Sequence, residues 1–299
     1  MITAQHLTKR FDDVTAVNAI DLTMTEGEVF GLIGTNGAGK STLFRMLAGI
    51  YKPDEGEILV DGEPVWENDA VKRKVFYISD DQFSFLNATP LEMAEYYRLF
   101  YPAFDGNRLY KILDDFGLDK KRKIKTFSKG MKKQVFLLIG ICSGAKYLLM
   151  DETFDGLDPV MRQAAKSLLA TNMVDAGQTP VIASHNLREL EDLCDHVGLL
   201  HKGGVILSKD LVALRAGLHR IQMVLKDGMM IRELTGLDIV KKESRGKLHT
   251  LTVRGEEAEI RRVIESYEPV FYEIIPLSLE EIFISETEVA GYELKSFIF

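Results

Sequence analysis

A nine-residue stretch that is rich in glycine and carries one lysine has the composition of a phosphate-binding loop. It fits the pattern G-x-x-x-x-G-K-S/T and reads Gly34-Thr35-Asn36-Gly37-Ala38-Gly39-Lys40-Ser41-Thr42. Because glycine has no Cβ, such a backbone comes close to a ligand, and its N–H groups form an anion site at the N-terminus of the following helix. Lys40 would bring its charge to the β- and γ-phosphates of a nucleotide, and Ser41 would offer its hydroxyl oxygen to Mg²⁺.

Two acids and a histidine stand at the ends of predicted strands further along the chain. Asp151 and Glu152 follow directly on the apolar run 147–150, and His185 follows the predicted strand 180–183 by one residue. Ligands of parallel α/β sheets bind at the carboxyl ends of the strands, so Asp151 is placed to hold Mg²⁺ and Glu152 to take a proton from water. An imidazole at such a strand end can contact a γ-phosphate. The alternative is two solvated acids and a structural histidine, and the phosphate loop upstream argues against it.

Apolar runs and turn signals predict the α/β elements that position these residues. The run 28–33 predicts a buried strand before the loop, and the periodicity of residues 43–48 predicts a helix after it, which Gly49 ends. Thr89, followed by Pro90, and Ser128 are predicted N-caps of two later helices. The other predicted strands are 2–7, 16–17, 20–24, 57–60, 75–78, 147–152, 180–183, 197–200 and 205–208. The other predicted helices are 108–116, 135–142, 160–173 and 187–194.

Two side-chain groups have a simple structural interpretation. An aromatic stripe on the helix after Thr89 is interpreted as core rather than as a ligand site, and comprises Met93, Tyr96, Tyr97 and Phe100. A basic cluster is interpreted as a solvated face, with proximity to phosphates or to anionic lipid as the alternative. It comprises Lys120, Lys121, Arg122, Lys123 and Lys125.

The sequence pattern changes near residue 219, where a small α+β appendage is predicted to begin. Its predicted strands are 221–225, 248–253 and 271–275, and a helix is predicted at 256–266. Ser278 and Glu281 form a capping-box pattern before a last short helix. We place the boundary between residues 211 and 219 and expect two domains, residues 1–215 and 216–299.

Composition limits the classes to which the protein can belong. The chain has 299 residues with a net charge of −8 and a pI of about 5.4, which argues against a nucleic-acid partner. Cys142 and Cys194 lie in apolar helical patterns and are expected to be buried free thiols. We recognise neither a signal region at the start nor an apolar run long enough to span a membrane. The expectation is a soluble, cytoplasmic protein that would need another chain to cross a membrane.

In their order along the chain, these motifs resemble the ATP-binding subunit of a bacterial ABC transporter. The resemblance covers about residues 1–210. It rests on the phosphate loop, Ser128, the pair Asp151-Glu152, the segment 156–158 and His185. It implies a P-loop NTPase fold with a mixed sheet core and a helical subdomain at about 85–145, with ATP and Mg²⁺ as ligands.

The resemblance also implies a role for each matching residue. Phe11 would stack on adenine, and residues 34–42 would hold the phosphates. Asp151 with Ser41 would serve Mg²⁺, Glu152 would be the general base, and His185 would be the switch histidine. Ser128 and Gly130 would contact the γ-phosphate of ATP on a second subunit, and Asp158 would communicate across that dimer.

The sequence departs from the family pattern in three places. The signature reads Phe127-Ser128-Lys129-Gly130-Met131 where Leu-Ser-Gly-Gly-Gln is preferred, so Lys129 could favour a non-identical partner subunit. In the glutamine loop, Asp80 stands at the expected position and Gln82 follows two residues later. Either could fill the metal-sensing role, and Gln82 is our candidate metal ligand. Thr153-Phe154 replace the usual Pro-Thr.

The function implied by the resemblance is that of an ATP-hydrolysing motor in a membrane exporter. The segment 277–283 is similar to the tail of bacterial exporter-type subunits. The expected partners are integral membrane subunits and a second ATP-binding subunit, identical or homologous, at the inner face of the membrane. One rival is a soluble ABC ATPase of translation, repair or chromosome organisation; the single cassette and the lack of heptads between Lys40 and Asp151 argue against it. The other is a non-enzymatic nucleotide-binding regulator. The substrate stays open among peptide, drug-like molecule and lipid.

Overall fold

The predicted strands of the first unit of the chain, Met1–Ser208, form two sheets. One sheet is antiparallel, with the strand order β2-β1-β4-β5. Its strands are β1 (Ile2–Phe11), β2 (Val14–Met24), β4 (Glu55–Val60) and β5 (Glu63–Pro64). The computed structural model describes residues 1–226 and 234–289; residues 227–233 and 290–299, which fall in the predicted C-terminal part, lie outside the described residues.

Strands β1 and β2 run through the gaps that the sequence pattern suggested. The β1–β2 register shifts between Ala4 and Leu7 and again between Leu7 and Lys9. His6 and Ala19 have positive φ angles of 49° and 47°. Bulges of this kind add a residue and break the period-two alternation without ending the strand. The prediction of three short strands at 2–7, 16–17 and 20–24 was therefore wrong in its boundaries. Strand β1 continues to Phe11, and β2 is one strand from Val14 to Met24.

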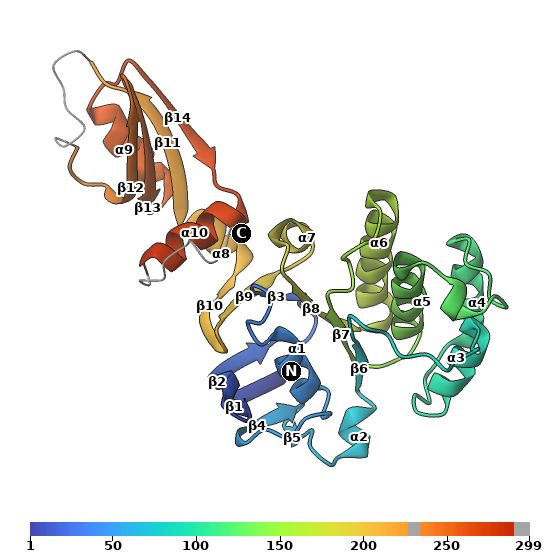
Figure 1. Cartoon of the computed structure of the whole chain (residues 1–299). Helices are drawn as coiled ribbons and strands as arrows, with labels where there is room; N and C mark the ends of the chain where they lie inside the picture. The colour runs from blue at the N-terminus through green and yellow to red at the C-terminus, as the bar shows by residue number, and fades with distance from the viewer. Residues whose placement is uncertain (227–233, 290–299) are drawn as a thin grey trace. The chain divides into compact units, whose positions relative to one another are not determined.

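The second sheet holds β3, β7 and β8 side by side (Figure 1). Its order is β10-β9-β3-β8-β7-β6, and β3 pairs in parallel with β8 and β9, while β7 pairs in parallel with β6 and β8. The strands are β3 (Phe30–Ile33), β6 (Val75–Ile78), β7 (Tyr147–Asp151), β8 (Thr179–Ser184), β9 (His196–His201) and β10 (Gly204–Asp210). Because parallel strands end at the same edge, the segments that follow β3, β7 and β8 meet there.

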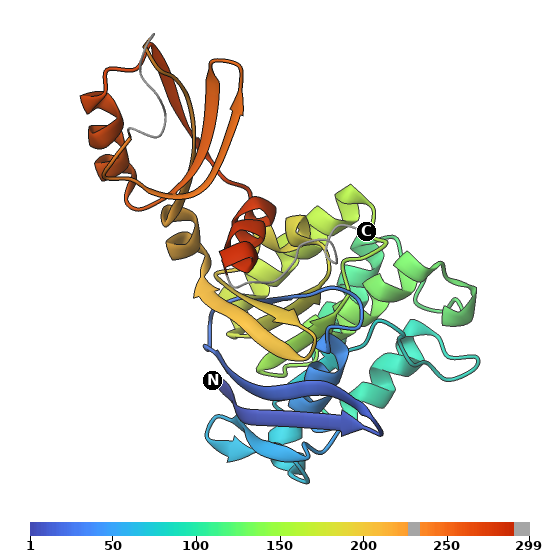
Figure 2. The same cartoon turned by 60° about the vertical axis from the view of Figure 1, so that its left-hand side comes forward.

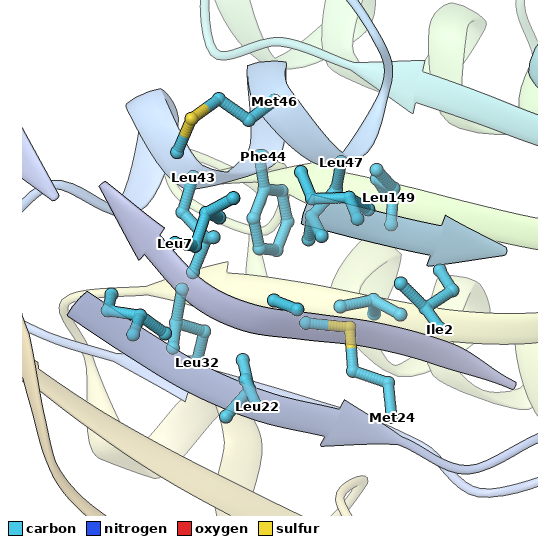
Figure 3. Packing of buried hydrophobic residues seen from close by; sticks show 14 of the residues in the cluster. Ile2, Leu7, Leu22, Met24, Leu32, Leu43, Phe44, Met46, Leu47 and Leu149 are labelled. Carbon is cyan, nitrogen blue, oxygen red and sulfur yellow. The ribbon is translucent and has the colours of Figure 1, made fainter. Parts of the chain in front are cut away.

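Helix α1 (Lys40–Leu47) fixes the phosphate loop by packing into the core that the two sheets share. Leu43, Phe44 and Leu47 of α1 are fully buried in one apolar cluster with residues of both sheets (Figure 3). Ile2 and Leu7 come from the antiparallel sheet, and Leu32 and Leu149 come from the parallel one. Burial of about 1.5–3 kcal/mol per large apolar side chain anchors the helix whose first turn carries Lys40.

The remaining helices of this unit are α2 (Asp69–Lys72), α3 (Pro90–Arg98), α4 (Gly106–Asp115), the 3₁₀ turn Ile124–Thr126, α5 (Lys129–Ile141), α6 (Pro159–Ala176) and α7 (Leu187–Glu191). Helices α5, α6 and α7 contact the parallel sheet (Figure 1). Helices α3, α4 and α5 pack on one another. The predicted N-caps are confirmed: Thr89 forms a capping box with Glu92, and Ser128 Oγ accepts from the Met131 N–H at 3.2 Å.

The aromatic stripe of α3 is only partly core. Met93 is fully buried, and the ring of Tyr97 packs on Phe76 with centroids 5.0 Å apart. Phe100, however, is 48% exposed, and Tyr96 is half-buried. Residues 93 and 97 are four apart and share one helix face, residue 96 lies on the next face, and Phe100 follows the end of α3. The core interpretation was therefore wrong for Phe100, which lies on the surface.

Both cysteines are buried free thiols, as predicted. Burial raises the pKa of Cys142 to about 12 and raises the pKa of Cys194 as well. The reactive form of cysteine is the thiolate, so neither residue is a nucleophile at neutral pH. In the basic cluster, residues 121–123 and 125 are exposed to solvent, as a solvated face requires.

The second unit, Lys209–Phe299, is an α+β domain with its own core. Its antiparallel sheet has the order β12-β13-β11-β14, and α9 packs on one face (Figure 2). The elements are α8 (Leu211–Ala216), β11 (Leu218–Val224), β12 (Asp238–Arg245), β13 (Leu248–Arg254), α9 (Glu257–Ser266), β14 (Phe271–Pro276) and α10 (Leu279–Val289). The predicted capping box is present: the Ser278 N–H donates to Glu281 Oε2 at 3.0 Å. Across the described parts of both units, each helix is too short or too polar to span a bilayer.

Candidate functional site

The phosphate loop has a backbone that requires glycine. Gly39 is the N-cap of α1 and adopts a left-handed conformation with φ 106°, and Gly37 has φ 79°. A Cβ on Gly39 would lie 2.2 Å from the carbonyl oxygen of Ala16. The Ala38 N–H donates to Thr35 O at 3.0 Å and closes a tight turn. The sequence motif therefore folds as a close-packed turn that leads into a helix N-terminus, the arrangement that binds phosphate.

Lys40 reaches back across this loop from the first turn of α1. Its side chain is 5% exposed, and its Nζ donates to Gly34 O at 2.6 Å and to Thr35 O at 3.3 Å. The same Nζ lies 3.2 Å from Glu152 Oε1. The ammonium group thus joins the phosphate loop to the end of β7, and its charge faces the concave side of the loop where a nucleotide phosphate would lie.

Asp151 carries a buried oxygen that has no partner among the described residues. The residue is 1% exposed; Oδ2 accepts from the Tyr77 hydroxyl at 3.2 Å, while Oδ1 is buried and unpaired. Burial is the main cause that raises the pKa of Asp151; the nearby Glu152 adds to it, and the hydroxyls of Ser41 and Tyr77 oppose it. An unpaired carboxylate oxygen beside a serine hydroxyl is the donor set that Mg²⁺ prefers. The residues present therefore fit the ion that the sequence predicts.

Glu152 is the centre of the site. Its carboxylate contacts Lys40 through Oε1 and His185 through Oε2, which lies 2.7 Å from His185 Nδ1. Its backbone N–H donates to Ala183 O at 2.9 Å, and its carbonyl accepts from the Nζ of Lys133. Glu152 has φ 50°, a left-handed conformation that is rare for a residue with a side chain. It is therefore held from β8, from α1 and from α5 in a strained conformation.

The signature segment and Asp158 form a second group. Ser128 caps α5, and a Cβ on Gly130 would lie 3.0 Å from Gly156 O, so this helix start lies against the loop that follows β7. Asp158 is the N-cap of α6 and accepts from the N–H groups of Val160 at 3.1 Å and Met161 at 3.0 Å. None of the contacts described here joins Ser128, Gly130 or Asp158 to Lys40, Asp151 or His185.

Phe11 lies at the end of β1 and forms a third group. Its side chain is 40% exposed, and its ring meets the Tyr51 ring edge-on, with centroids 5.5 Å apart. Lys9 Nζ lies 5.5 Å from the centroid of the Phe11 ring. A partly exposed aromatic face of this kind can stack on a base, the role that the sequence predicts.

The two candidates of the glutamine loop have different environments. The Gln82 Nε2 donates to Ser79 O at 2.9 Å, within its own loop. Asp80 Oδ1 lies 2.8 Å from Lys133 Nζ and 3.6 Å from Lys129 Nζ. The role of Gln82 as a metal ligand stays a prediction. Asp80 forms ion pairs with two lysines of α5, the helix that begins after Ser128.

Sequence reasoning missed two side chains that touch the predicted site. Tyr77 donates to Asp151 from the neighbouring strand β6, and Lys133 donates to the Glu152 carbonyl. A tyrosine in an apolar strand gives no signal by itself. Lys133 did give a signal in the sequence, because it is a cation that stands just before the long apolar run of α5.

The chain is similar to known ABC transporter ATP-binding proteins in both sequence and structure. The family model described as ABC transporter matches residues 17–155. The chain is 27% identical over 288 residues to the ABC transporter ATP-binding protein YtrB of Bacillus subtilis, covering 96% of this chain and 98% of that protein. It is 31% identical over 212 residues to the lantibiotic transport ATP-binding protein SrtF of Streptococcus pyogenes, covering 70% of this chain and 91% of that one. A solved ATP-binding subunit of an ABC transporter matches with a TM-score of 0.67 at 25% identity, over 72% of this chain and 92% of that chain.

Proposed function

This chain belongs to the ABC transporter family as the ATP-hydrolysing subunit of a transporter, and we propose that the transporter is an exporter. The observation that carries the ATP-hydrolysing role is the placement of Glu152 between Lys40 and His185, beside the phosphate loop. The export direction is proposed from the lantibiotic transport ATP-binding protein SrtF. In this arrangement Glu152 takes a proton from the attacking water, and the ammonium group of Lys40 stabilises the negative charge of the phosphates. The base Glu152 and the cation Lys40 needed for phosphoryl transfer to water thus lie together at one sheet edge, with His185 beside them.

We assign nucleotide contacts to residues of four segments: the phosphate loop with α1, strand β1, strand β7 and the segment after β8. The backbone of residues 34–42 cradles the phosphates, and Phe11 stacks on the base. Asp151 and Ser41 hold Mg²⁺, and bound Mg²⁺ would neutralise charge on the β- and γ-phosphates. His185 keeps its Nδ1 on Glu152, so its Nε2 is the nitrogen that can turn to a γ-phosphate.

The second group supports a site shared by two subunits. Ser128 is exposed at the start of α5, and Asp158 is at the start of α6. The helix N-terminus at Ser128 suits an anion, and it makes no described contact with the phosphate loop of its own chain. We therefore propose that Ser128 and Gly130 complete the ATP site of a second, identical or homologous subunit, with Asp158 at the same interface. Closure on two ATP molecules and reopening after hydrolysis would then drive the transporter.

An exposed aromatic surface supports docking to transmembrane subunits. Phe83 and Phe85 are 61% and 48% exposed, and Phe100 is 48% exposed. Their rings are linked through Tyr96: the centroids of Phe83 and Phe85 are 5.2 Å apart, those of Phe85 and Tyr96 5.0 Å, and those of Tyr96 and Phe100 5.1 Å. A continuous apolar patch of this kind marks an interaction surface. We assign it to the membrane subunits, which would hold the chain at the cytoplasmic face of the membrane.

The substrate class is proposed from the relatives alone. SrtF is named for lantibiotic transport, and its similarity covers 70% of this chain. We propose that the exported substrate is an amphipathic peptide. The sites proposed on this chain are the nucleotide site and the aromatic surface, since the substrate itself would meet the membrane subunits.

Transport by inside-out membrane vesicles tests the proposal. The vesicles would contain this chain with the membrane subunits encoded beside it, and a fluorescent lantibiotic-type peptide would be added outside. We expect ATP-dependent accumulation of the peptide inside, abolished when Glu152→Gln replaces the wild-type chain. Accumulation in right-side-out vesicles instead would contradict the export direction, and a purified chain that binds soluble partners but no membrane subunit would contradict the docking assignment.

A further inference from the structure

Lys133 is a fully buried cation on the helix that follows the signature segment. It lies in the second turn of α5, and its side chain is 0% exposed. From Val135 to Ile141 every residue of the helix is buried as well. An ammonium group in such surroundings persists in its charged form only where it is paired and hydrogen-bonded. The residues that face Lys133 therefore decide what it does.

Two groups from different elements face the Lys133 ammonium. The backbone carbonyl of Glu152, just after β7, accepts a hydrogen bond from Nζ. The carboxylate of Asp80, in the loop after β6, lies 2.8 Å from the same Nζ. Lys129, one turn earlier on α5, lies 3.6 Å from Asp80, but its side chain is 65% exposed. Asp80 thus supplies the counter-charge of Lys133, and the Glu152 carbonyl fixes its direction.

The contact with Glu152 falls where the backbone is strained. At φ 50° Glu152 is in the left-handed region, so its peptide groups need partners to keep their orientation. The N–H is held by Ala183 O at 2.9 Å, and the carbonyl is held by Lys133. The orientation of this residue decides where its carboxylate points relative to His185 and the phosphate loop.

We propose that Lys133 is a positioning residue for ATP hydrolysis, which holds Glu152 in its productive orientation and is itself held in place by the carboxylate of Asp80. The inference rests on the proposed role of Glu152 as the general base. It assigns a function to two residues that act through Glu152. It also gives the acid at position 80 a structural partner, since Asp80 and Lys133 form an ion pair across the loop and the helix.

The charge state of Asp80 agrees with this pairing. Burial acts to raise the pKa of Asp80, but the adjacent charges of Lys133 and Lys129 outweigh it and hold the pKa below its ordinary value. Asp80 is therefore ionised at neutral pH and available as the counter-charge. Removing either member leaves the other without its partner, so the two substitutions should not act independently.

Single-turnover kinetics of four variants test the proposal, with Lys132→Met as the matched control on the same helix. The variants are Lys133→Met, which keeps length and loses charge, Lys133→Arg, Asp80→Asn, and the double variant. We expect Lys133→Met to lower the hydrolysis rate constant about 10- to 100-fold, because displacement of a catalytic group by about 1 Å has effects of that size. ATP affinity, measured with a fluorescent analogue, should change less than about threefold, and Lys133→Arg should recover part of the rate. The control should hydrolyse at the wild-type rate.

The double variant and Glu152→Gln make the outcome unambiguous. If Asp80 acts through Lys133, the double variant loses no more rate than the worse single variant, whereas multiplied losses would overturn the pairing. Wild-type hydrolysis by a folded Lys133→Met protein would overturn the positioning role. If Lys133→Met does not fold, Asp80→Asn, at the half-exposed end of the pair, replaces it, and a wild-type rate there would equally overturn the proposal. Glu152→Gln is measured in parallel: if it retains wild-type turnover, the proposed function fails, and if it is inactive while Lys133→Met is fully active, only this inference fails.

Discussion

Glu152 Oε2 lies 2.7 Å from His185 Nδ1, although the two residues are 33 positions apart in the sequence. The contact exists because β7 and β8 are parallel neighbours, so the residues that follow Asp151 and Ser184 meet at the same edge. The side chain of Glu152 is 13% exposed and that of His185 is 44% exposed. The imidazole therefore covers the carboxylate from the solvent side, and Lys40 meets it from the loop side.

Replacing Glu152 by Gln should separate ATP binding from hydrolysis. The amide keeps the shape of the side chain and the possibility of a hydrogen bond to His185, but it cannot accept the proton of water. General base catalysis contributes about 10²- to 10⁴-fold, so we expect kcat to fall by that range while the Kd for ATP stays within about threefold. Phosphate release and nucleotide titration measure the two quantities. A variant with wild-type turnover would remove Glu152 from its role, and Glu191→Gln, outside the site, serves as the control.

Replacing Lys40 by Ala should weaken nucleotide binding rather than only catalysis. Lys40 is 5% exposed and aimed at the loop, so its charge-assisted contacts with phosphate would be made without solvent competition. Hydrogen bonds to charged groups contribute about 1.5–3 kcal/mol, which corresponds to about a 10- to 150-fold higher Kd for ATP. Titration calorimetry checks this value. Lys72→Ala, on α2, should bind ATP like the wild type, and an unchanged Kd in Lys40→Ala would refute the loop assignment.

The parts of the site that could be predicted are those formed by residues that are contiguous in the sequence. The phosphate loop is one such segment: its glycines and Lys40 give both the pattern and the conformation, and the structure shows the close approach of Gly39 to Ala16 that excludes a side chain. The two acids at the end of β7 are another. The N-caps Thr89 and Ser128 were predicted because a cap depends on residues within one turn.

The contacts that the sequence did not reveal depend on pairing between distant segments. The Tyr77 hydroxyl reaches Asp151 across a strand pair, and Lys133 reaches Glu152 from a helix 19 residues earlier. Strand β12 was missed because its sequence, Asp238–Arg245, is mostly charged; edge strands carry such residues to prevent further pairing. Bulges in β1 and β2 likewise hid the length of those strands, since the alternation that marks a strand fails at each bulge.

Asp151→Asn should abolish Mg²⁺-dependent hydrolysis while stabilising the nucleotide-free protein. Burial raises the pKa of Asp151, so its ionised form is disfavoured in the folded state. For an acid with a raised folded pKa, stability falls as the pH rises from the ordinary value of about 3.9 through the folded value. The charge therefore costs stability at neutral pH, and the neutral amide removes that cost.

Thermal unfolding without nucleotide measures this effect. The Tm of Asp151→Asn should exceed that of the wild type at pH 7, and the difference should disappear below about pH 4, where the wild-type acid is protonated in both states. Adding Mg²⁺ with ATP should raise the Tm of the wild type more than that of the variant, because a ligand that binds the folded state stabilises it. A variant with a lower Tm at pH 7 would show that Asp151 is paired in a way that offsets its burial.

Asp61 should make the ATP-binding unit sensitive to acid. Its carboxylate accepts from the Tyr147 hydroxyl at 2.7 Å, from Lys146 Nζ at 2.9 Å and from the α-amino group of Met1 at 2.8 Å. Burial alone would raise the pKa of Asp61, but these donors outweigh it and hold the pKa well below its ordinary value. A lowered folded pKa contributes stability above the ordinary value of about 3.9, and that contribution is lost as the pH falls below it.

Urea denaturation of Asp61→Asn at two pH values tests this prediction. The side chain of Asp61 is 22% exposed, so solvent screening reduces the value of its contacts, and we expect a loss of about 1–2 kcal/mol in the free energy of unfolding at pH 7. At pH 3 the difference between variant and wild type should shrink. At that pH the wild-type carboxylate is mostly protonated in the unfolded state but still ionised in the folded state, so folding must release a proton and the stability gained from the charge is smaller. Glu63→Gln is the control: it lies 4.0 Å from Lys74 with a side chain that is 58% exposed, and it should change the stability by less than about 0.5 kcal/mol at either pH. A loss in Asp61→Asn that is equal at both pH values would mean that hydrogen bonding rather than charge stabilises this cluster.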